Sequence, residues 1–277
     1  MKTSRQNDNH YEIGSKYFEN GLYDKAISSF KKTIKSDSID EYDLRDNIDA
    51  YIMIAMSYMS SEDDSKECLE NAIKYYKLYI NNIKKINFGG EIKGAHKVVY
   101  DDLGLAYQIL GDIPNALKYY EESIKYGNFV SNTYINLIYI YLNHTNQIDK
   151  ALNLGLKFVE FDSQNEYAYI NLALVYKQLN ELDKAKKTLE DAISIVDSPY
   201  KSYCNLSDIY LTKKEFEKAK EFALKALEIE ENDYISISNL ADAYFGLGDN
   251  DLAKKYFMKV LEIEPGFEPA IEGLSKI

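Results

Sequence analysis

Tyrosines recur along this 277-residue chain at a nearly constant interval. Seven of them form the series, and we refer to them as the repeat tyrosines: Tyr17, Tyr58, Tyr107, Tyr141, Tyr176, Tyr210 and Tyr244. The last five are separated by 34, 35, 34 and 34 residues. An interval of about 34 residues is the length of one helix-turn-helix unit, which cannot bury its apolar face alone. The sequence therefore predicts a core built by stacking neighbouring units.

Other positions repeat in register with these tyrosines. The residue four before each tyrosine is aliphatic in all seven units, and the residue three before it is small in six. A small residue there allows two helix backbones to approach closely. An alanine follows nine residues after the tyrosine in five units. In the other two, Ala72 and Ala151 are displaced by five residues and by one, between helices, where insertions cost little.

This set of positions resembles the tetratricopeptide repeat family over nearly the whole chain. The resemblance extends to a bulky residue thirteen after the tyrosine in several units, such as Phe30 and Phe257, and to Pro265 at the end of the last unit. Gly155 and Ala223 depart from it, because an aromatic residue is usual there. The resemblance implies an all-α fold, a right-handed superhelical solenoid of about seven helix-turn-helix repeats with a C-terminal capping helix.

We expect one solenoid over residues 1–277, since a solenoid grows by adding units. The repeats are expected at approximately 7–40, 48–86, 97–130, 131–165, 166–199, 200–233 and 234–267, followed by a cap at 267–277. The predicted cap helix carries four apolar residues on one face, which would cover the last repeat or dock a partner or a second copy: Ala270, Ile271, Leu274 and Ile277. The glycine-containing segment 87–96 is interpreted either as a hinge or as a surface loop.

Composition narrows the classes of partner and compartment. The formal net charge is −12 and arginine occurs only at Arg5 and Arg45, so we expect no nucleic acid partner, because such partners are bound mainly by neutralising phosphates. No stretch approaches the eighteen apolar residues of a membrane span, and the first residues are polar, so no membrane or signal segment is expected. The two cysteines are far apart in sequence, which is typical of a reduced, cytoplasmic protein.

Catalysis finds little support in the sequence. The three histidines, His10, His96 and His144, lie in different units and cannot be paired by spacing. Neither a metal site nor a nucleophile activated by histidine can be assembled from them. Carboxylates are interleaved with lysines in a pattern that supports solvated helices. We therefore expect no enzyme activity, no metal and no cofactor.

Helical periodicity separates a packed side from a free side of each first helix. At 100° per residue, the positions −7, −4, −3 and 0 relative to the repeat tyrosine lie together, and −9, −5, −2 and +2 lie opposite them. In tetratricopeptide arrays the first helices line the concave surface. The resemblance thus implies that the second set of positions contacts a ligand.

Position −5 is asparagine in the last four repeats: Asn136, Asn171, Asn205 and Asn239. A carboxamide has both a donor and an acceptor, so it can pair with a peptide unit of an extended chain. The arrangement is similar to the asparagine ladder of peptide-binding members of the family. The alternative is that asparagine is only a soluble residue tolerated there, although its helix propensity is mediocre.

The remaining candidate peptide-binding residues include apolar and charged side chains. They are Met53, Met56, Leu105, Tyr139, Tyr167, Leu174, Lys201, Asp208 and Asp242. Exposed apolar side chains without a partner would be a liability, so a ligand is inferred. We expect an extended or helical protein segment with apolar residues near its middle and Lys or Arg towards one end. The Lys, Asn and Arg clamp that holds chaperone carboxylates in this family is not matched, because the candidate positions carry no arginine.

The sequence as a whole predicts a non-catalytic adaptor that binds a protein or peptide in a concave groove, as a monomer or weak homo-oligomer. Two other functions remain open: a structural assembly protein that self-associates, and a peptide-responsive regulatory sensor.

Overall fold

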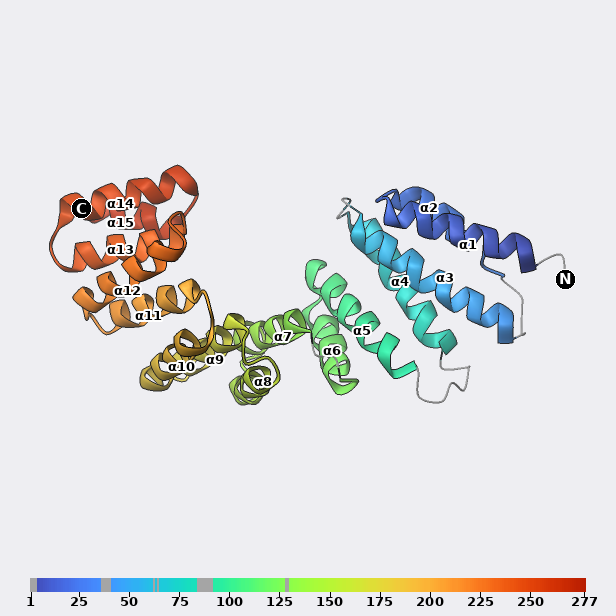
Figure 1. Ribbon diagram of the computed structural model, residues 1–277, viewed down its shortest axis with the longest axis horizontal. Helices are drawn as coiled ribbons and strands as arrows, with labels where there is room; N and C mark the ends of the chain where they lie inside the picture. The colour runs from blue at the N-terminus through green and yellow to red at the C-terminus, as the bar shows by residue number, and fades with distance from the viewer. Residues whose placement is uncertain (1–3, 36–40, 62, 64, 84–91, 128–129) are drawn as a thin grey trace. The chain divides into compact units, whose positions relative to one another are not determined.

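The computed structural model describes residues 4–35, 41–61, 63, 65–83, 92–127 and 130–277. Within those residues the chain contains fifteen α-helices and no strand (Figure 1). It divides into two compact units, residues 1–133 and 134–277, and each is described by itself. No helix in the described part of the chain is long and apolar enough to cross a bilayer.

The first unit consists of three helical hairpins. Their helices are α1 (Ser4–Glu19), α2 (Tyr23–Lys31), α3 (Glu41–Ser60), α4 (Lys66–Ile83), α5 (Ile92–Ile109) and α6 (Ile113–Lys125). We call the first helix of each hairpin the leading helix and the second the trailing helix. Each trailing helix also packs against the next leading helix, α2 on α3 and α4 on α5. The hairpins therefore share one continuous core.

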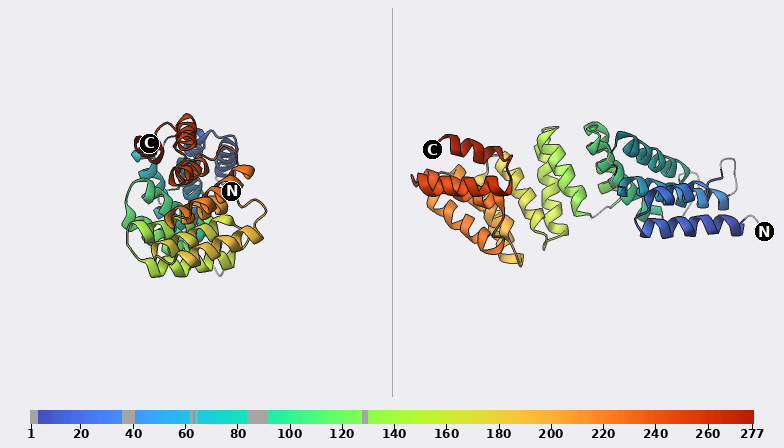
Figure 2. Two further views of the ribbon diagram at one scale, coloured as in Figure 1. Left: turned by 90° about the vertical axis from the view of Figure 1, so that its left-hand side faces the viewer. Right: turned by 90° about the horizontal axis from the view of Figure 1, so that it is seen from above.

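The second unit repeats this arrangement four times and ends in a single helix. The helices are α7 (Ser131–Asn143), whose first turn precedes the unit boundary, α8 (Ile148–Phe161), α9 (Glu166–Gln178), α10 (Leu182–Ile195), α11 (Tyr200–Thr212), α12 (Phe216–Ile229), α13 (Tyr234–Gly246), α14 (Asn250–Ile263) and α15 (Glu268–Ser275). The antiparallel hairpins can be followed in Figure 2. Seven hairpins and a cap confirm the predicted fold class. Of the segment interpreted as a hinge or loop, residues 87–91 lie outside the described residues and residues 92–96 begin α5.

In six of the seven hairpins, the turn depends on a residue in the left-handed conformation. Such a residue stands four after the repeat tyrosine in five hairpins: Gly21, Gly111, Asn180, Lys214 and Gly248. The next amide then donates back to the tyrosine carbonyl, as Asp112 does to Tyr107 over 2.9 Å. In the α7–α8 hairpin this residue is Asn146, one position later. That insertion is the physical reason for the displaced alanine at Ala151.

Aromatic rings from the trailing helices fill the space beside the tyrosines. In the third hairpin the ring of Tyr119 stacks between Tyr107, with centroids 5.4 Å apart, and Tyr100, at 6.1 Å. Phe222 takes the same place between Tyr210 and Tyr203. Offset stacking of this kind adds about 0.5–1.5 kcal/mol per pair beyond the burial of area. The inserted ring stands twelve residues after the repeat tyrosine, a position the sequence pattern did not single out.

Small residues on the leading helices meet large rings of the trailing helices, as the pattern predicted. A Cβ atom added to Gly104 would lie 2.5 Å from Cδ1 of Tyr120, which is fully buried. Gly14 stands in the same relation to Phe30. The close approach of the two helices therefore depends on the missing side chain.

The cap helix α15 covers the last hairpin with only part of its apolar sequence. Ala270 and Gly273 are buried, and Leu274 packs against the cluster around Phe257. Ile271 and Ile277 remain 42% and 40% exposed. The single apolar face predicted for the cap is thus shared between the core and the surface.

We expect the Gly104→Ala variant to lower the free energy of unfolding by about 1–3 kcal/mol, because the added methyl overlaps the buried Tyr120 ring. Urea unfolding followed by circular dichroism measures this. Gly266→Ala is the control, since an added Cβ there meets nothing within 4 Å. Equal midpoints for the two variants would contradict the close approach.

Candidate functional site

Three leading helices of the second unit, α9, α11 and α13, lie on the inner side of its curve. Contacts join α9 to α11 and α11 to α13, whereas contacts of that extent do not join α10 to α12 or α12 to α14, in a part of the chain that is fully described. Helices on the inner side of a curved stack approach each other most closely, and such stacks form concave binding surfaces. The predicted positions −9, −5 and −2 therefore belong to a surface that can be examined as one candidate site.

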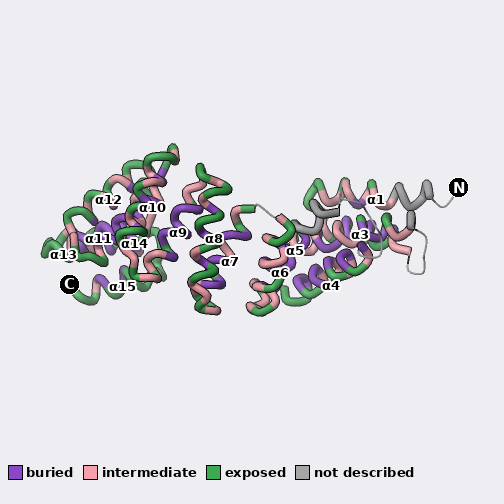
Figure 3. The backbone as a smooth tube through the Cα atoms, turned by 90° about the horizontal axis from the view of Figure 1, so that it is seen from below, coloured by how far each residue is buried: buried purple, intermediate pink, exposed green. Residues whose placement is uncertain are grey.

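We call this the leading-helix surface and define it by the side chains that α7, α9, α11 and α13 contribute to it. They are Asn136, Tyr139, Tyr167, Asn171, Leu174, Lys177, Lys201, Asn205, Asp208, Ile235, Asn239 and Asp242. Three of its predicted apolar members are strongly exposed: Tyr139 by 50%, Tyr167 by 44% and Leu174 by 41%. Figure 3 shows buried, intermediate and exposed positions along the helices of the second unit. These three side chains are therefore accessible to a ligand.

The four asparagines differ in their surroundings. Asn171 and Asn239 are buried, at 7% and 9% exposure, whereas Asn136 and Asn205 are half-buried. Nδ2 of Asn171 donates to the Tyr167 carbonyl over 2.8 Å, and Nδ2 of Asn205 donates to the Lys201 carbonyl over 2.8 Å. Both bonds lie within one helix and hold the carboxamide in one orientation.

Asn239 has a different role from the other asparagines. Its Nδ2 donates across to the Cys204 carbonyl on α11 over 3.0 Å, in a buried position. This bond links two consecutive leading helices. A contact between residues that are 35 positions apart leaves no local signal in the sequence. Sequence reasoning therefore could not distinguish Asn239 from the other three asparagines.

Three of the four charged side chains of the surface have a direct partner within the protein. Lys177 on α9 forms an ion pair with Asp208 on α11. Lys201 donates to the Tyr167 hydroxyl and lies 4.6 Å from the centroid of that ring. Burial acts to lower the pKa of Lys201, but hydrogen bonds to the hydroxyls of Tyr167 and Tyr200 outweigh it, and the pKa is raised.

Asp242 is the exception among these charges. Within the fully described second unit, no hydrogen bond or ion pair reaches its carboxylate. Burial raises the pKa of Asp242 to about 6, with a further increase from Asp208 and an opposing effect of Lys276, which follows α15. The last helix of the leading-helix surface, α13, therefore carries a partly desolvated carboxyl group.

The three candidate residues of the first unit have separate surroundings. Met53 is half-buried and packs against the cluster of Ile27 and Phe30, so it contributes to the core between α2 and α3. Met56 is half-buried. Leu105 is exposed and shares one face of α5 with two further exposed apolar residues, Val98 and Ile109. Helix α5 thus presents an apolar stripe among the described residues of this unit.

Asp102 takes position −5 in the first unit, where the later repeats have asparagine. The hydroxyl of the fully buried Tyr76 donates to its carboxylate. Burial raises the pKa of Asp102 to about 6, although the hydrogen bond from Tyr76 acts in the opposite direction. This carboxyl group links α4 to α5, a role that sequence reasoning missed.

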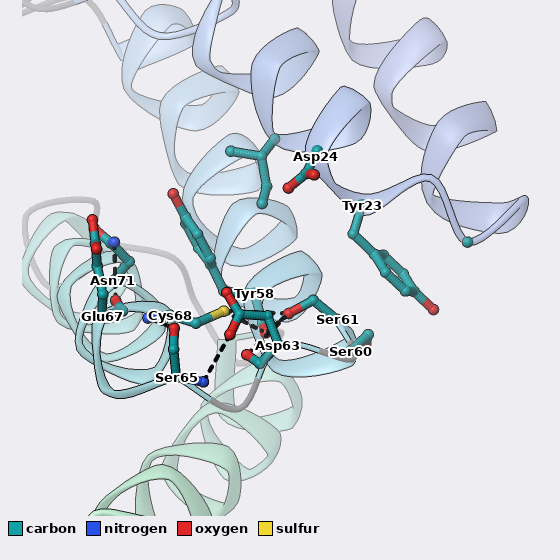
Figure 4. A pocket seen from close by; sticks show the side chains of 12 residues that line it. Tyr23, Asp24, Tyr58, Ser60, Ser61, Asp63, Ser65, Glu67, Cys68 and Asn71 are labelled. Carbon is teal, nitrogen blue, oxygen red and sulfur yellow. Dashed lines mark hydrogen bonds between the residues drawn. The ribbon is translucent and has the colours of Figure 1, made fainter.

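A polar cavity of about 810 Å³ lies in the first unit, between the α1–α2 turn and the connection from α3 to α4 (Figure 4). Carboxylates and hydroxyls line it, and several already bind local backbone, as Asp63 accepts from the Ser65 amide over 2.9 Å. It contains none of the predicted site residues. Among the described residues, no cluster of His, Cys, Asp or Glu could hold a metal ion.

Comparisons with known proteins define the class of this protein. Four segments match the family model described as tetratricopeptide repeat: 99–126, 166–195, 200–233 and 236–267. A tetratricopeptide repeat protein from Parabacteroides merdae superposes with a TM-score of 0.66 at 14% identity, covering 98% of each chain. The C-terminal part of such a protein from Cytophaga hutchinsonii gives 0.64 at 17% identity, covering 95% of this chain and 99% of that one.

A thermophilic tetratricopeptide repeat protein from Thermus thermophilus gives a TM-score of 0.55 at 22% identity, covering 65% of this chain and 97% of that one. The sequence matches none of the curated proteins. The fold is therefore that of a stacked-hairpin interaction scaffold. The chain contains tetratricopeptide repeats in these four segments and has the fold of tetratricopeptide repeat proteins. Proteins of this family bind protein or peptide partners, so this one is a protein–protein interaction adaptor in general terms.

We expect the Asp102→Asn variant to change how stability depends on pH. The pKa of Asp102 is raised in the folded protein, so its favourable contribution is complete below about pH 4 and is lost as the pH rises through about 6. Asn cannot titrate but still accepts from Tyr76. The variant should therefore gain stability relative to the unaltered protein as the pH increases from 5 to 7.5, measured by urea unfolding. A difference that is constant over this range would contradict the assignment.

Proposed function

We propose that the leading-helix surface of the second unit binds an extended segment of a partner protein. The observation that carries this proposal is the exposure of Tyr167 and Leu174 on the inner side of the unit, with Tyr139 exposed on α7 at the position that corresponds to Leu174. Ile235, at 44% exposure, adds a fourth apolar side chain on α13. Exposed apolar side chains gathered on one surface are typical of sites that bind a protein partner.

Carboxamides beside these side chains suit recognition of a peptide backbone. Asn171 and Asn205 each use one N–H to bind their own helix, which leaves the second N–H and Oδ1 for a ligand. Because the orientation is already set, less conformational entropy is lost on binding. Asn205 is the more accessible of the two. Asn239 stabilises the surface by joining α11 to α13 through a hydrogen bond.

The side chains of the surface change from apolar to acidic along the stack, and a partner would have to match that order. Position −2 carries Tyr139 and Leu174 on α7 and α9, and then Asp208 and Asp242 on α11 and α13. A segment with apolar residues followed by Lys or Arg fits this order. The net charge of −12 would also steer a basic segment towards the protein. We propose binding without chemistry, by a monomer or weak homo-oligomer in the cytoplasm; the two free cysteines, both buried, are compatible with that compartment.

Selection from a random library of displayed twelve-residue peptides, followed by calorimetry, tests the proposal. We expect enrichment of peptides with apolar and basic residues. Asn171→Ala combined with Asn205→Ala should weaken their binding about tenfold, as loss of one or two net hydrogen bonds implies, with unchanged helical content.

The control combines Asn153→Ala with Asn250→Ala, which removes two exposed asparagines from trailing helices. It should bind as the unaltered protein does. Equal weakening by both pairs, or equal affinity for acidic and basic peptides, would count against the proposed function.

A further inference from the structure

The pairing of charges on the leading-helix surface distinguishes its two aspartates. Lys177 neutralises Asp208 within the protein, and Lys201 is bound by the Tyr167 hydroxyl. Asp242 remains without a direct partner. The charged groups that act on it are Asp208 from α11, itself paired with Lys177, and Lys276 from the end of α15. Trailing helices α12 and α14, which also pack on α13, add none.

An unpaired carboxylate in a partly desolvated position is unfavourable, because burial removes hydration that no donor replaces. Lys276 relieves this only in part: its charge acts to lower the pKa of Asp242, but its ammonium forms an ion pair with Glu272, at 3.8 Å. The raised pKa of Asp242 is the expected result of that deficit. A cation supplied by a ligand would replace the lost hydration.

The distance from Asp242 to the apolar part of the surface follows from the repeat. Leu174 and Asp242 stand at the same position, −2, on leading helices that are two steps apart, α9 and α13. Axes of packed helices lie about 8–10 Å apart, so the two side chains are separated by roughly 16–20 Å. An extended chain covers that distance in about five to six residues, whereas a helix needs about eleven to thirteen.

We propose that Asp242 selects a Lys or Arg side chain that stands about six residues from an apolar residue packed on Leu174, in a segment bound in extended conformation. This inference rests on the proposed function and makes it more specific. Asp242 is thus a specificity residue, while Asp208 is a structural member of an ion pair.

Calorimetry with the full chain and defined peptides tests the spacing. The probes are acetylated twelve- to fifteen-residue peptides in a Ser/Gln background, each with one Phe and one Arg separated by four, six, eight or twelve positions. We expect the separation of six to bind most tightly. Non-acetylated peptides without Arg show whether an N-terminal amine can replace the side chain, and their tight binding would overturn selection of Lys or Arg.

The Arg→Gln peptide shows whether Asp242 reads the charge. We expect the loss of Arg to cost about tenfold in affinity at pH 7.5, equivalent to about 1.4 kcal/mol, and less than about threefold at pH 5, where Asp242 is protonated. Asp242→Asn should remove the preference at both pH values. Asp197→Asn, which changes an exposed aspartate in the α10–α11 connection, should keep it.

The outcomes separate this inference from the proposed function. Binding of every peptide with no effect of Asp242→Asn on the Arg preference would overturn the role of Asp242 and leave the peptide surface intact. An optimum at twelve positions would overturn the extended conformation. Failure of all peptides, including those selected from the library, would overturn the proposed function itself.

Discussion

The contact between a small residue on each leading helix and a large ring on its trailing helix controls the rest of this structure. Gly104 against Tyr120 shows it most clearly, because no Cβ fits between them. The left-handed residue four positions after the repeat tyrosine reverses the chain at the distance that this contact needs. Once one side of the leading helix packs within the hairpin, its opposite side is left to face a neighbouring helix, solvent or a ligand. The exposure of Tyr139 and Leu174 follows from that division.

Two carboxyl groups on leading helices illustrate how burial between helices raises a pKa. Asp102 and Asp242 both lie on leading helices, and burial raises the pKa of each to about 6. In the first unit, Tyr76 extends from the trailing helix of the preceding hairpin and donates to Asp102. At Asp242 no donor is present in the fully described second unit. The same burial therefore produces a structural link in one case and, as we propose, a receptor for a cation in the other.

Pairing within the surface also limits what an acidic protein can bind. The net charge of −12 suggests many free carboxylates, but on the leading-helix surface the charge of Asp208 is already neutralised by Lys177. Tyr167 in turn supplies both an exposed ring and the hydroxyl that holds Lys201. Few groups are thus available to a ligand, and we propose that selectivity depends on their spacing along the stack more than on total charge.

By itself, the sequence determined the seven hairpins, the cap and the side of each leading helix that packs, because these follow from local periodicity and from turns within one repeat. The tertiary structure alone decided which residues on the free side are accessible. Asn239 is buried and donates a hydrogen bond to Cys204. Met53 packs against α2, and Asp208 forms an ion pair with a lysine on α9. The stacking rings of Tyr119 and Phe222 were equally hidden from the pattern. A helical period reports the direction of a side chain, whereas its burial and pairing depend on neighbouring helices, most of them about one repeat away in sequence, and on the rotamers chosen when the helices pack.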